Sequence, residues 1–142
     1  NLFLRQHARR QQETGVSRTF VLVAPSDPYP KPIRGFFTLV AAQLDSELLD
    51  ATQARKLPSK APYILLARLA VAKSEQGMGL GGVLLAEAIS RTLQVSSEIG
   101  VSGLFVEAKD SKAAAFYERF GFVPFPSDPL RLYQSLKDLR RP

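Results

Sequence analysis

The 142-residue sequence has no cysteine and only one histidine, His7. The absence of cysteine excludes disulfide bonds, thiolate nucleophiles and zinc–thiolate sites. A single histidine also offers too few ligands for a catalytic metal site built from protein side chains, so we predict no bound metal. Any chemistry must therefore come from a bound cofactor or from hydroxyl, amine and carboxylate groups.

Long apolar runs are also absent, and none approaches the roughly 18 residues that a helix needs to cross a bilayer. The N-terminus lacks a charged region followed by an apolar segment, the pattern of a secretion signal. We therefore expect a soluble, cytoplasmic protein with no membrane partner. The length and the 45% hydrophobic content match one compact domain over residues 1–142.

The formal net charge is +6, from 19 Lys and Arg against 13 Asp and Glu. This balance favours polyanionic partners, although basic side chains often do no more than solvate a surface. Arg68 is the only charge in the apolar run 63–71, so it should face a cleft or a partner. Arg5 and Arg9, four residues apart, would share one face of a helix. Together with Arg34, these arginines are our candidates for contacting a polyanion.

The hydrophobic pattern alternates between helices and strands. A basic helix is predicted over residues 2–14 and should end at Gly15. β-Branched and aromatic runs predict strands over residues 19–24, 35–40, 63–71, 103–108 and 130–136. Further helices are predicted over residues 46–55, 79–97 and 111–120. This order predicts an α/β fold with one mixed sheet.

A glycine-rich loop, Gln76-Gly-Met-Gly-Leu-Gly-Gly82, lies between a predicted strand and a predicted helix. Glycines let backbone N–H groups approach a ligand closely, and the helix directs its positive end at it. A pyrophosphate would fit there, and the alternative interpretation is a structural turn. A P-loop would need Gly-Lys-Ser/Thr, which is missing. A dinucleotide fingerprint would need an acidic residue at the end of the next strand, and Glu107 lies too far from the glycines for that role. The chain is also too short to contain two mononucleotide-binding halves.

Two motifs carry a resemblance to a known family. Gln76-x-x-Gly79-x-Gly81 resembles the coenzyme A pyrophosphate loop of GNAT acetyltransferases, and Ala115-Phe-Tyr-Glu-Arg-Phe-Gly-Phe122 resembles that family's helix and turn. The resemblance extends to the GNAT toxins of bacterial toxin–antitoxin pairs through four further segments. These are Leu66-Ala-Arg-Leu-Ala-Val71, Ala108-Lys-Asp110, Pro126-Ser-Asp-Pro-Leu130 and Leu136-Lys-Asp-Leu139.

The resemblance implies a GNAT fold, with a single mixed and mostly antiparallel sheet flanked by helices. Two features depart from the family pattern. The family has a strand before its first helix, whereas this sequence begins at about the predicted helix. Many relatives have a histidine where this sequence has Glu107, so no role is carried over to that position.

The resemblance also implies a donor site for acetyl-CoA. Leu69, Ala70 and Val71 would pair with pantetheine like an added strand. The pyrophosphate would be held by the seven loop residues Gln76, Gly77, Met78, Gly79, Leu80, Gly81 and Gly82. Tyr117 would be the general acid that protonates the departing thiolate. By composition alone, a tyrosine in Phe116-Tyr117 is more often a core residue.

Toxins of this subgroup acetylate the α-amine of aminoacyl-tRNA and halt translation, so the resemblance implies that substrate. It also implies a ribbon-helix-helix antitoxin with a disordered tail, and a homodimer. Glu107 could accept a proton through water, or it could be a solvated or salt-bridged residue. A dedicated base need not be present, because an α-amine has a reference pKa of about 8 and an aminoacyl ester should have a lower one. Two alternatives stay open: an acetyltransferase for small amines or protein N-termini, and a non-catalytic acetyl-CoA-binding or RNA-binding module. The second would not need the Tyr117 hydroxyl.

Overall fold

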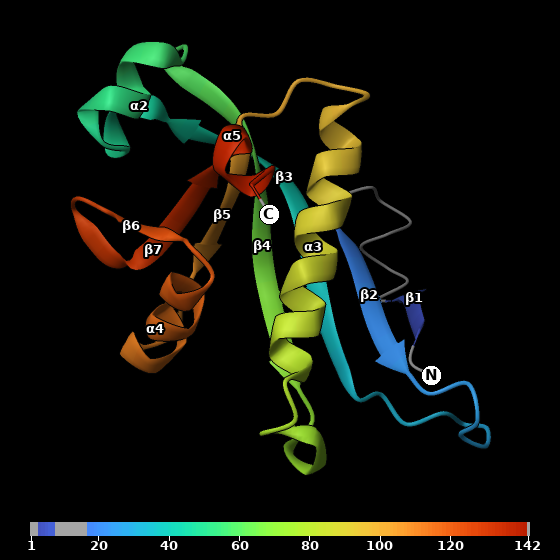
Figure 1. Cartoon of the computed structure of the whole chain (residues 1–142). Helices are drawn as coiled ribbons and strands as arrows, with labels where there is room; N and C mark the ends of the chain where they lie inside the picture. The colour runs from blue at the N-terminus through green and yellow to red at the C-terminus, as the bar shows by residue number, and fades with distance from the viewer. Residues whose placement is uncertain (1–2, 8–16, 142) are drawn as a thin grey trace. The chain divides into compact units, whose positions relative to one another are not determined.

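A computed structural model describes residues 3–7 and 17–141 (Figure 1). These residues form a seven-stranded sheet with the order β1-β2-β3-β4-β5-β7-β6. The strands are β1 Phe3–His7, β2 Arg18–Val23, β3 Gly35–Asp45, β4 Lys60–Val71, β5 Gly103–Glu107, β6 Val123–Phe125 and β7 Asp128–Ser135. The helices are η1 Ser46–Leu48, α2 Ala51–Lys56, η2 Lys73–Glu75, α3 Leu80–Ser96, α4 Ser111–Arg119 and α5 Leu136–Leu139.

The chain divides into two compact units. The first contains residues 1–40 and 66–90, and the second contains residues 41–65 and 91–142. Strands β3 and β4 contribute residues to both units. One domain over residues 1–142 stays a prediction, and each unit is described by itself.

The first unit has its core on strands β2 and β3. Val21, Leu22 and Val23 are all buried, as their continuous apolar run predicts for a strand covered on both faces. The rings of Phe20 and Phe37 stack with their centroids 5.1 Å apart across the antiparallel pair. Aromatic cross-strand pairs of this kind stabilise a sheet and fix its register.

Helix α3 places Leu84, Leu85 and Ala88 in the same core, all fully buried. A Cβ atom on Gly35 would lie 2.8 Å from Leu84 Cδ1 and 3.0 Å from the Ala70 carbonyl oxygen. The first contact is shorter than real Cβ atoms show, and the second is tighter than most Cβ contacts. Glycine at position 35 therefore allows α3 and β4 to approach the start of β3.

The second unit packs around a separate cluster of aromatic and aliphatic side chains. Its buried members are Leu44, Leu49, Ala61, Tyr63, Phe105, Phe125 and Tyr133. The Tyr133 hydroxyl donates to Asp50 Oδ2 at 2.6 Å, and Asp50 Oδ1 accepts from the Gln53 N–H at 3.0 Å as the N-cap of α2. One carboxylate thus joins β7 to the first turn of α2.

The predicted fold class is confirmed, since the chain is α/β with one mostly antiparallel sheet and helices accompany the sheet. The predicted order of strand, glycine loop, helix and strand is also found, from β4 to β5. No helix in the described part of the chain is long and apolar enough to cross a membrane.

The predicted helix over residues 2–14 is wrong for residues 3–7, which form strand β1. This strand pairs antiparallel with β2, with Phe3 opposite Val23 and His7 opposite Thr19. Backbone pairing with a neighbouring strand outweighs the small free-energy differences that make up helix propensity. Residues 8–16, the rest of the predicted helix, lie outside the described residues. Strand β6 was missed because its three residues include a proline.

Candidate functional site

The glycine loop has a backbone conformation that glycine adopts more readily than other residues. Gly77 and Gly79 have φ angles of 84° and 78°, in the left-handed region that residues with a Cβ rarely adopt. A Cβ atom added to either glycine would have no neighbour within 4 Å, so the space beside them is open. Gly81 and Gly82 lie in the first turn of α3, where backbone N–H groups lack partners within the helix. This arrangement can accept an anion.

Gln76 connects the glycine loop to the end of β4. The Gln76 side chain donates from Nε2 to the Val71 carbonyl oxygen at 3.2 Å, which holds the start of the loop against the strand. Met78 is 65% exposed, an unusual position for a large apolar side chain. Leu80 is half-buried at the first position of α3. The loop therefore offers both backbone donors and an exposed apolar side chain to a ligand.

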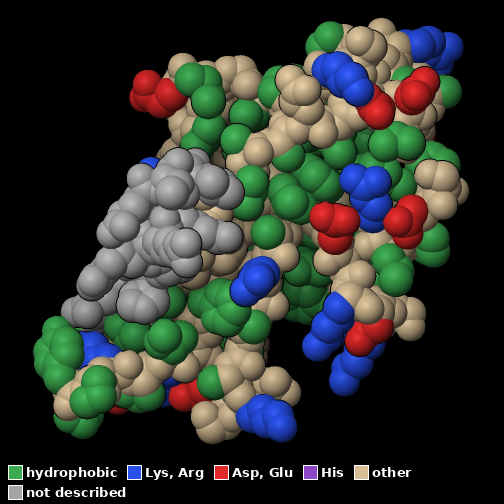
Figure 2. All heavy atoms as spheres, turned by 180° about the vertical axis from the view of Figure 1, so that it is seen from behind, with side chains coloured by type: hydrophobic (Ala, Val, Ile, Leu, Met, Phe, Trp, Pro, Cys, Tyr) green, Lys and Arg blue, Asp and Glu red, His purple; other side chains and the backbone are tan. Residues whose placement is uncertain are grey.

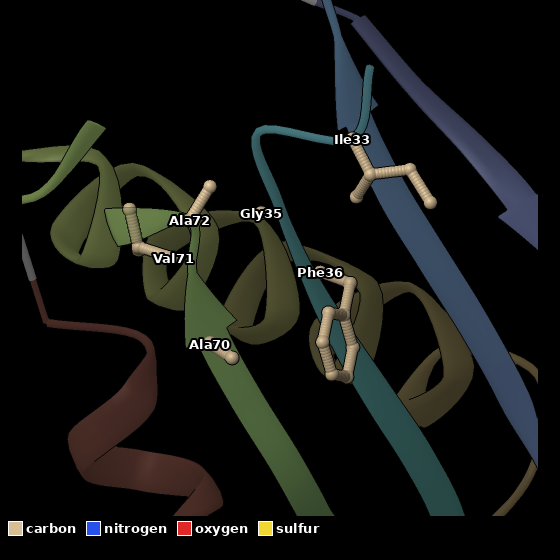
Figure 3. A pocket seen from close by; sticks show the side chains of 6 residues that line it. All are labelled: Ile33, Gly35, Phe36, Ala70, Val71 and Ala72. Carbon is tan, nitrogen blue, oxygen red and sulfur yellow. The ribbon is translucent and has the colours of Figure 1, made fainter. Parts of the chain in front are cut away.

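An open pocket of about 240 Å³ lies beside the carboxyl end of β4. Figure 3 shows the Phe36 ring and the Ile33 side chain next to this strand end. The lining is apolar and consists of Ile33, Gly35, Phe36, Ala70, Val71 and Ala72. Two of the three residues predicted to pair with pantetheine, Ala70 and Val71, thus line a pocket that suits an apolar group. Leu69 precedes them on the strand and is half-buried.

Tyr117 lies on α4 in the second unit. Asp110 caps this helix by accepting from the Ala113 N–H at 2.8 Å. The Tyr117 ring packs edge-on against Phe116 and Phe122, with centroid distances of 5.2 and 5.7 Å. Tyr117 is only 7% exposed, and burial raises the pKa of its phenol to about 12. The phenol is therefore protonated at neutral pH, as a general acid must be.

Of the four arginines predicted to contact a polyanion, the three that the structure describes lie in different places. Arg68 is exposed on β4 and has no ion-pair partner among residues 3–7 and 17–141. Arg34 is engaged by Asp27 and Glu75, and its hydrogen bond with Asp27 is the main cause of its raised pKa. Arg5 lies in β1 opposite Val21, so it is not on a helix as predicted.

Arg9 lies outside the described residues. Basic side chains do not gather in one patch on the face that Figure 2 shows. Figure 2 shows Lys and Arg side chains at several separate places on this face, interspersed with acidic ones. Each arginine therefore has to be tested individually.

Glu107 ends β5 and lies opposite Arg131 of β7. Arg131 Nε is 4.0 Å from Glu107 Oε2, and the Glu107 side chain is 57% exposed. An exposed pair at this distance contributes little to stability. Glu107 is thus accessible to water and only weakly paired.

Sequence reasoning missed Arg131. Its guanidinium lies over the rings of Phe125 and Phe105, at 4.8 and 5.8 Å from their centroids. Such cation–π contacts hold an arginine in place. The signal that selected Arg68, one charge within an apolar strand, is also present in the predicted strand 130–136 and could have identified Arg131.

Comparison with known proteins gives a consistent assignment. The family model described as acetyltransferase (GNAT) domain matches residues 32–124. The chain is 37% identical over 138 residues to the tRNA-acetylating toxin of Mycobacterium tuberculosis, covering 97% of this chain and 80% of that protein.

Two solved structures are similar in fold. One is a tyrosine-to-phenylalanine mutant of KacT, with a TM-score of 0.86, 33% identity, and coverage of 94% of this chain and 79% of that one. The other is a tyrosine-to-phenylalanine mutant of the toxin AtaT, bound to the C-terminus of the antitoxin AtaR and to acetyl-CoA. It has a TM-score of 0.75 and 29% identity, and the match covers 94% of this chain and 76% of that one.

Proposed function

The chain belongs to the GNAT acetyltransferase family, and we propose that it transfers the acetyl group of acetyl-CoA to the α-amine of an aminoacyl-tRNA. The observation that carries the proposal is the Gln76–Gly82 loop, whose left-handed glycines leave open space beside backbone donors at the start of α3. The acceptor follows from the similarity to a tRNA-acetylating toxin over nearly the whole chain. Acetylation blocks the amine that attacks the peptidyl ester, so translation stops.

The donor binds along the end of β4. Backbone groups of Leu69, Ala70 and Val71 pair with the pantetheine amides as an added strand would. The pocket beside Ala70 and Val71 accepts the apolar part of the pantetheine arm, because its lining contains no charged side chain. The pyrophosphate is held by the N–H groups of the loop and of the first turn of α3. Acetyl-CoA supplies the activated acetyl group as a thioester.

Acetyl transfer then needs a neutral amine and a proton for the leaving group. The amine nitrogen attacks the thioester carbonyl carbon, the C–S bond breaks, and the sulfur takes the proton of the Tyr117 phenol. The phenolate is reprotonated by the proton that the amine loses, directly or through water. An α-amine has a reference pKa of about 8, so roughly a tenth of it is already neutral at pH 7, and the lower pKa expected for an aminoacyl ester raises that fraction without a dedicated base. Glu107 is available to accept that proton through water, since it is exposed and weakly paired.

Arg68 is proposed to contact the tRNA, with Arg5 and Arg9 as weaker candidates. The support is that Arg68 is exposed on the same strand as the donor residues and has no ion-pair partner in the described part of the chain. Phosphate contacts supply affinity that falls with salt, because each contact releases counterions. Arg68 would thus contribute attraction without taking part in chemistry.

Arg68→Glu should raise KM for charged tRNA, leave acetyl-CoA affinity unchanged, and reduce the salt dependence by about one phosphate contact. Initial rates with radiolabelled acetyl-CoA at several salt concentrations measure these effects. Arg140→Glu is the matched control, because it makes the same charge change at an exposed position at the C-terminal end of α5. An equal rise in KM for both variants would mean that only net charge matters, and the assignment of Arg68 would fail.

The same assay distinguishes the proposed acceptor from its rivals. Charged tRNA, uncharged tRNA, free amino acid esters, polyamines and peptides are compared in parallel. We expect charged tRNA to be acetylated much faster than the corresponding ester, with uncharged tRNA as a competitor. Equal rates for esters and charged tRNA would favour an enzyme for small amines. Acetyl-CoA binding without any turnover would favour a non-catalytic module.

We also propose that the protein acts in the cytoplasm, where charged tRNA is found, and that it forms a homodimer and binds a ribbon-helix-helix antitoxin. The similar AtaT structure contains the C-terminus of an antitoxin, and the net charge of +6 suits an acidic tail. Co-expression from the native operon should recover a complex with a small partner, and light scattering should give twice the mass of one chain for the toxin alone. Recovery of an isolated monomer that is harmless when overexpressed would contradict both proposals.

A further inference from the structure

The connection between β2 and β3, residues 24–34, contains a half-buried lysine whose ammonium group binds three backbone carbonyl groups. Lys31 Nζ donates to the carbonyl oxygens of Ala24, Pro25 and Asp27 at 3.3, 2.6 and 2.7 Å. The Asp27 N–H donates to the Ala24 carbonyl at 3.2 Å, closing the turn. These bonds satisfy carbonyl groups that would otherwise point into an irregular segment. They hold Asp27 at a defined place on the turn.

Arg34, at the end of the same connection, joins this turn to the segment before the glycine loop. Its Nη2 donates to Asp27 Oδ1 and Oδ2 at 3.1 and 3.0 Å, and its Nη1 donates to Glu75 Oε1 at 2.7 Å. Glu75 is the last residue of η2 and directly precedes Gln76. The side chains of Arg34, Asp27 and Glu75 are 28%, 18% and 14% exposed, so the three charges are half-buried.

The backbone of Arg34 holds the other end of η2. The Ala72 N–H donates to the Arg34 carbonyl oxygen at 2.9 Å, and the Glu75 N–H donates to the Ala72 carbonyl oxygen at 2.9 Å. One residue therefore contacts the segment between β4 and the loop at its first and last positions. Its main chain binds Ala72 and its side chain binds Glu75.

We infer that Arg34 is a positioning residue for the pyrophosphate loop: it clamps η2 through Glu75, so that Gln76–Gly82 begins from a fixed point. This role rests on the proposed function. Gly77 and Gly79 have no side chains, and a Cβ at either would touch nothing within 4 Å, so packing contributes little to the loop's conformation. The loop must then be held at its ends, by α3 on one side and by η2 on the other. Holding it lowers the entropy cost of binding acetyl-CoA.

The bridge requires an arginine. Two carboxylates are engaged from different sides by the two Nη atoms of one planar guanidinium, a geometry that the single nitrogen of lysine cannot reproduce. The same bonds occupy the Nη atoms that would contact a phosphate. Arg34 thus supports acetyl-CoA binding, and Arg68 is the arginine proposed to contact RNA.

Calorimetric titration of acetyl-CoA into the full chain tests this role with Arg34→Gln, Arg34→Lys, Glu75→Gln and the double variant Arg34→Gln/Glu75→Gln. Each single variant should raise the Kd for acetyl-CoA roughly tenfold, and the double variant should bind no more weakly than either single one. KM for acetyl-CoA should rise while kcat at saturation and KM for charged tRNA stay the same. Lys60→Gln is the matched control, because it removes the ion pair with Asp45 in the second unit.

Thermal unfolding of each variant separates positioning from general stability. We expect the binding loss to persist at temperatures far below the melting transition. Wild-type Kd in Arg34→Gln and Glu75→Gln would overturn the inference, as would additive losses in the double variant or an equal loss in Lys60→Gln. A raised KM for tRNA with unchanged acetyl-CoA affinity would overturn it in favour of an RNA contact. A wild-type protein that binds no acetyl-CoA would instead reject the proposed function itself, and the clamp with it.

Discussion

Tyr117→Phe should lower kcat about 10²-fold or more while acetyl-CoA affinity stays the same. The substitution removes only the hydroxyl proton that the leaving sulfur needs. The ring contacts with Phe116 and Phe122 remain, so α4 should keep its packing. Single-turnover rates with charged tRNA measure the chemical step, and calorimetry measures cofactor affinity.

The matched control is Tyr29→Phe, because Tyr29 is 74% exposed and has no proposed part in the reaction. It should keep the wild-type rate. A wild-type single-turnover rate in Tyr117→Phe, with chemistry limiting, would eliminate Tyr117 as the acid. A rate loss accompanied by weaker acetyl-CoA binding would instead indicate a packing role.

The pH dependence follows from the buried phenol. The pKa of Tyr117 in the folded protein is about 12, above the reference value of about 10 for an exposed tyrosine. Its contribution to stability is therefore fully present below about pH 10 and is lost as pH rises through about 12. Deprotonation of the Tyr117 phenol should therefore cause no fall in kcat between about pH 7 and 10.

Gly79→Glu should abolish detectable acetyl-CoA binding while the far-ultraviolet circular dichroism spectrum stays unchanged. Gly79 has a φ angle of 78°, which strains any residue with a Cβ, and the new carboxylate would occupy the space that the pyrophosphate needs. The added side chain meets no protein atom nearby, so the fold should tolerate it. Calorimetry with acetyl-CoA gives the affinity.

Gly100→Glu controls for the same chemical change at another exposed glycine. A Cβ at Gly100 would also have no neighbour within 4 Å, and this residue lies in the connection before β5. Its affinity for acetyl-CoA should equal that of the wild type. Unchanged affinity in Gly79→Glu would reject the placement of the pyrophosphate on this loop.

Much of the fold could be predicted from local patterns, and the failures have a common cause. The strands around Phe20, Tyr63 and Phe105 were found because each is a continuous apolar run that must be buried. Helix α4 was found because Asp110 caps its start and Gly121 follows its end. Strand β1 was missed because its conformation depends on pairing with β2, whose closest partner, Thr19, lies twelve positions beyond His7.

The candidate site divides in the same way. The glycine loop could be found from the residues alone, because a left-handed backbone at Gly77 and Gly79 depends on the absence of a Cβ atom at each position and not on distant contacts. The sequence also singled out Arg68 and Tyr117 as residues to test. The surroundings of Arg34 and Arg131 became known from the folded chain alone. Glu75 lies 41 positions from Arg34, and Glu107 reaches Arg131 only across the β5–β7 pair. Steric and capping effects act within a few residues, whereas ion pairs and ring contacts depend on which distant segments the fold brings together.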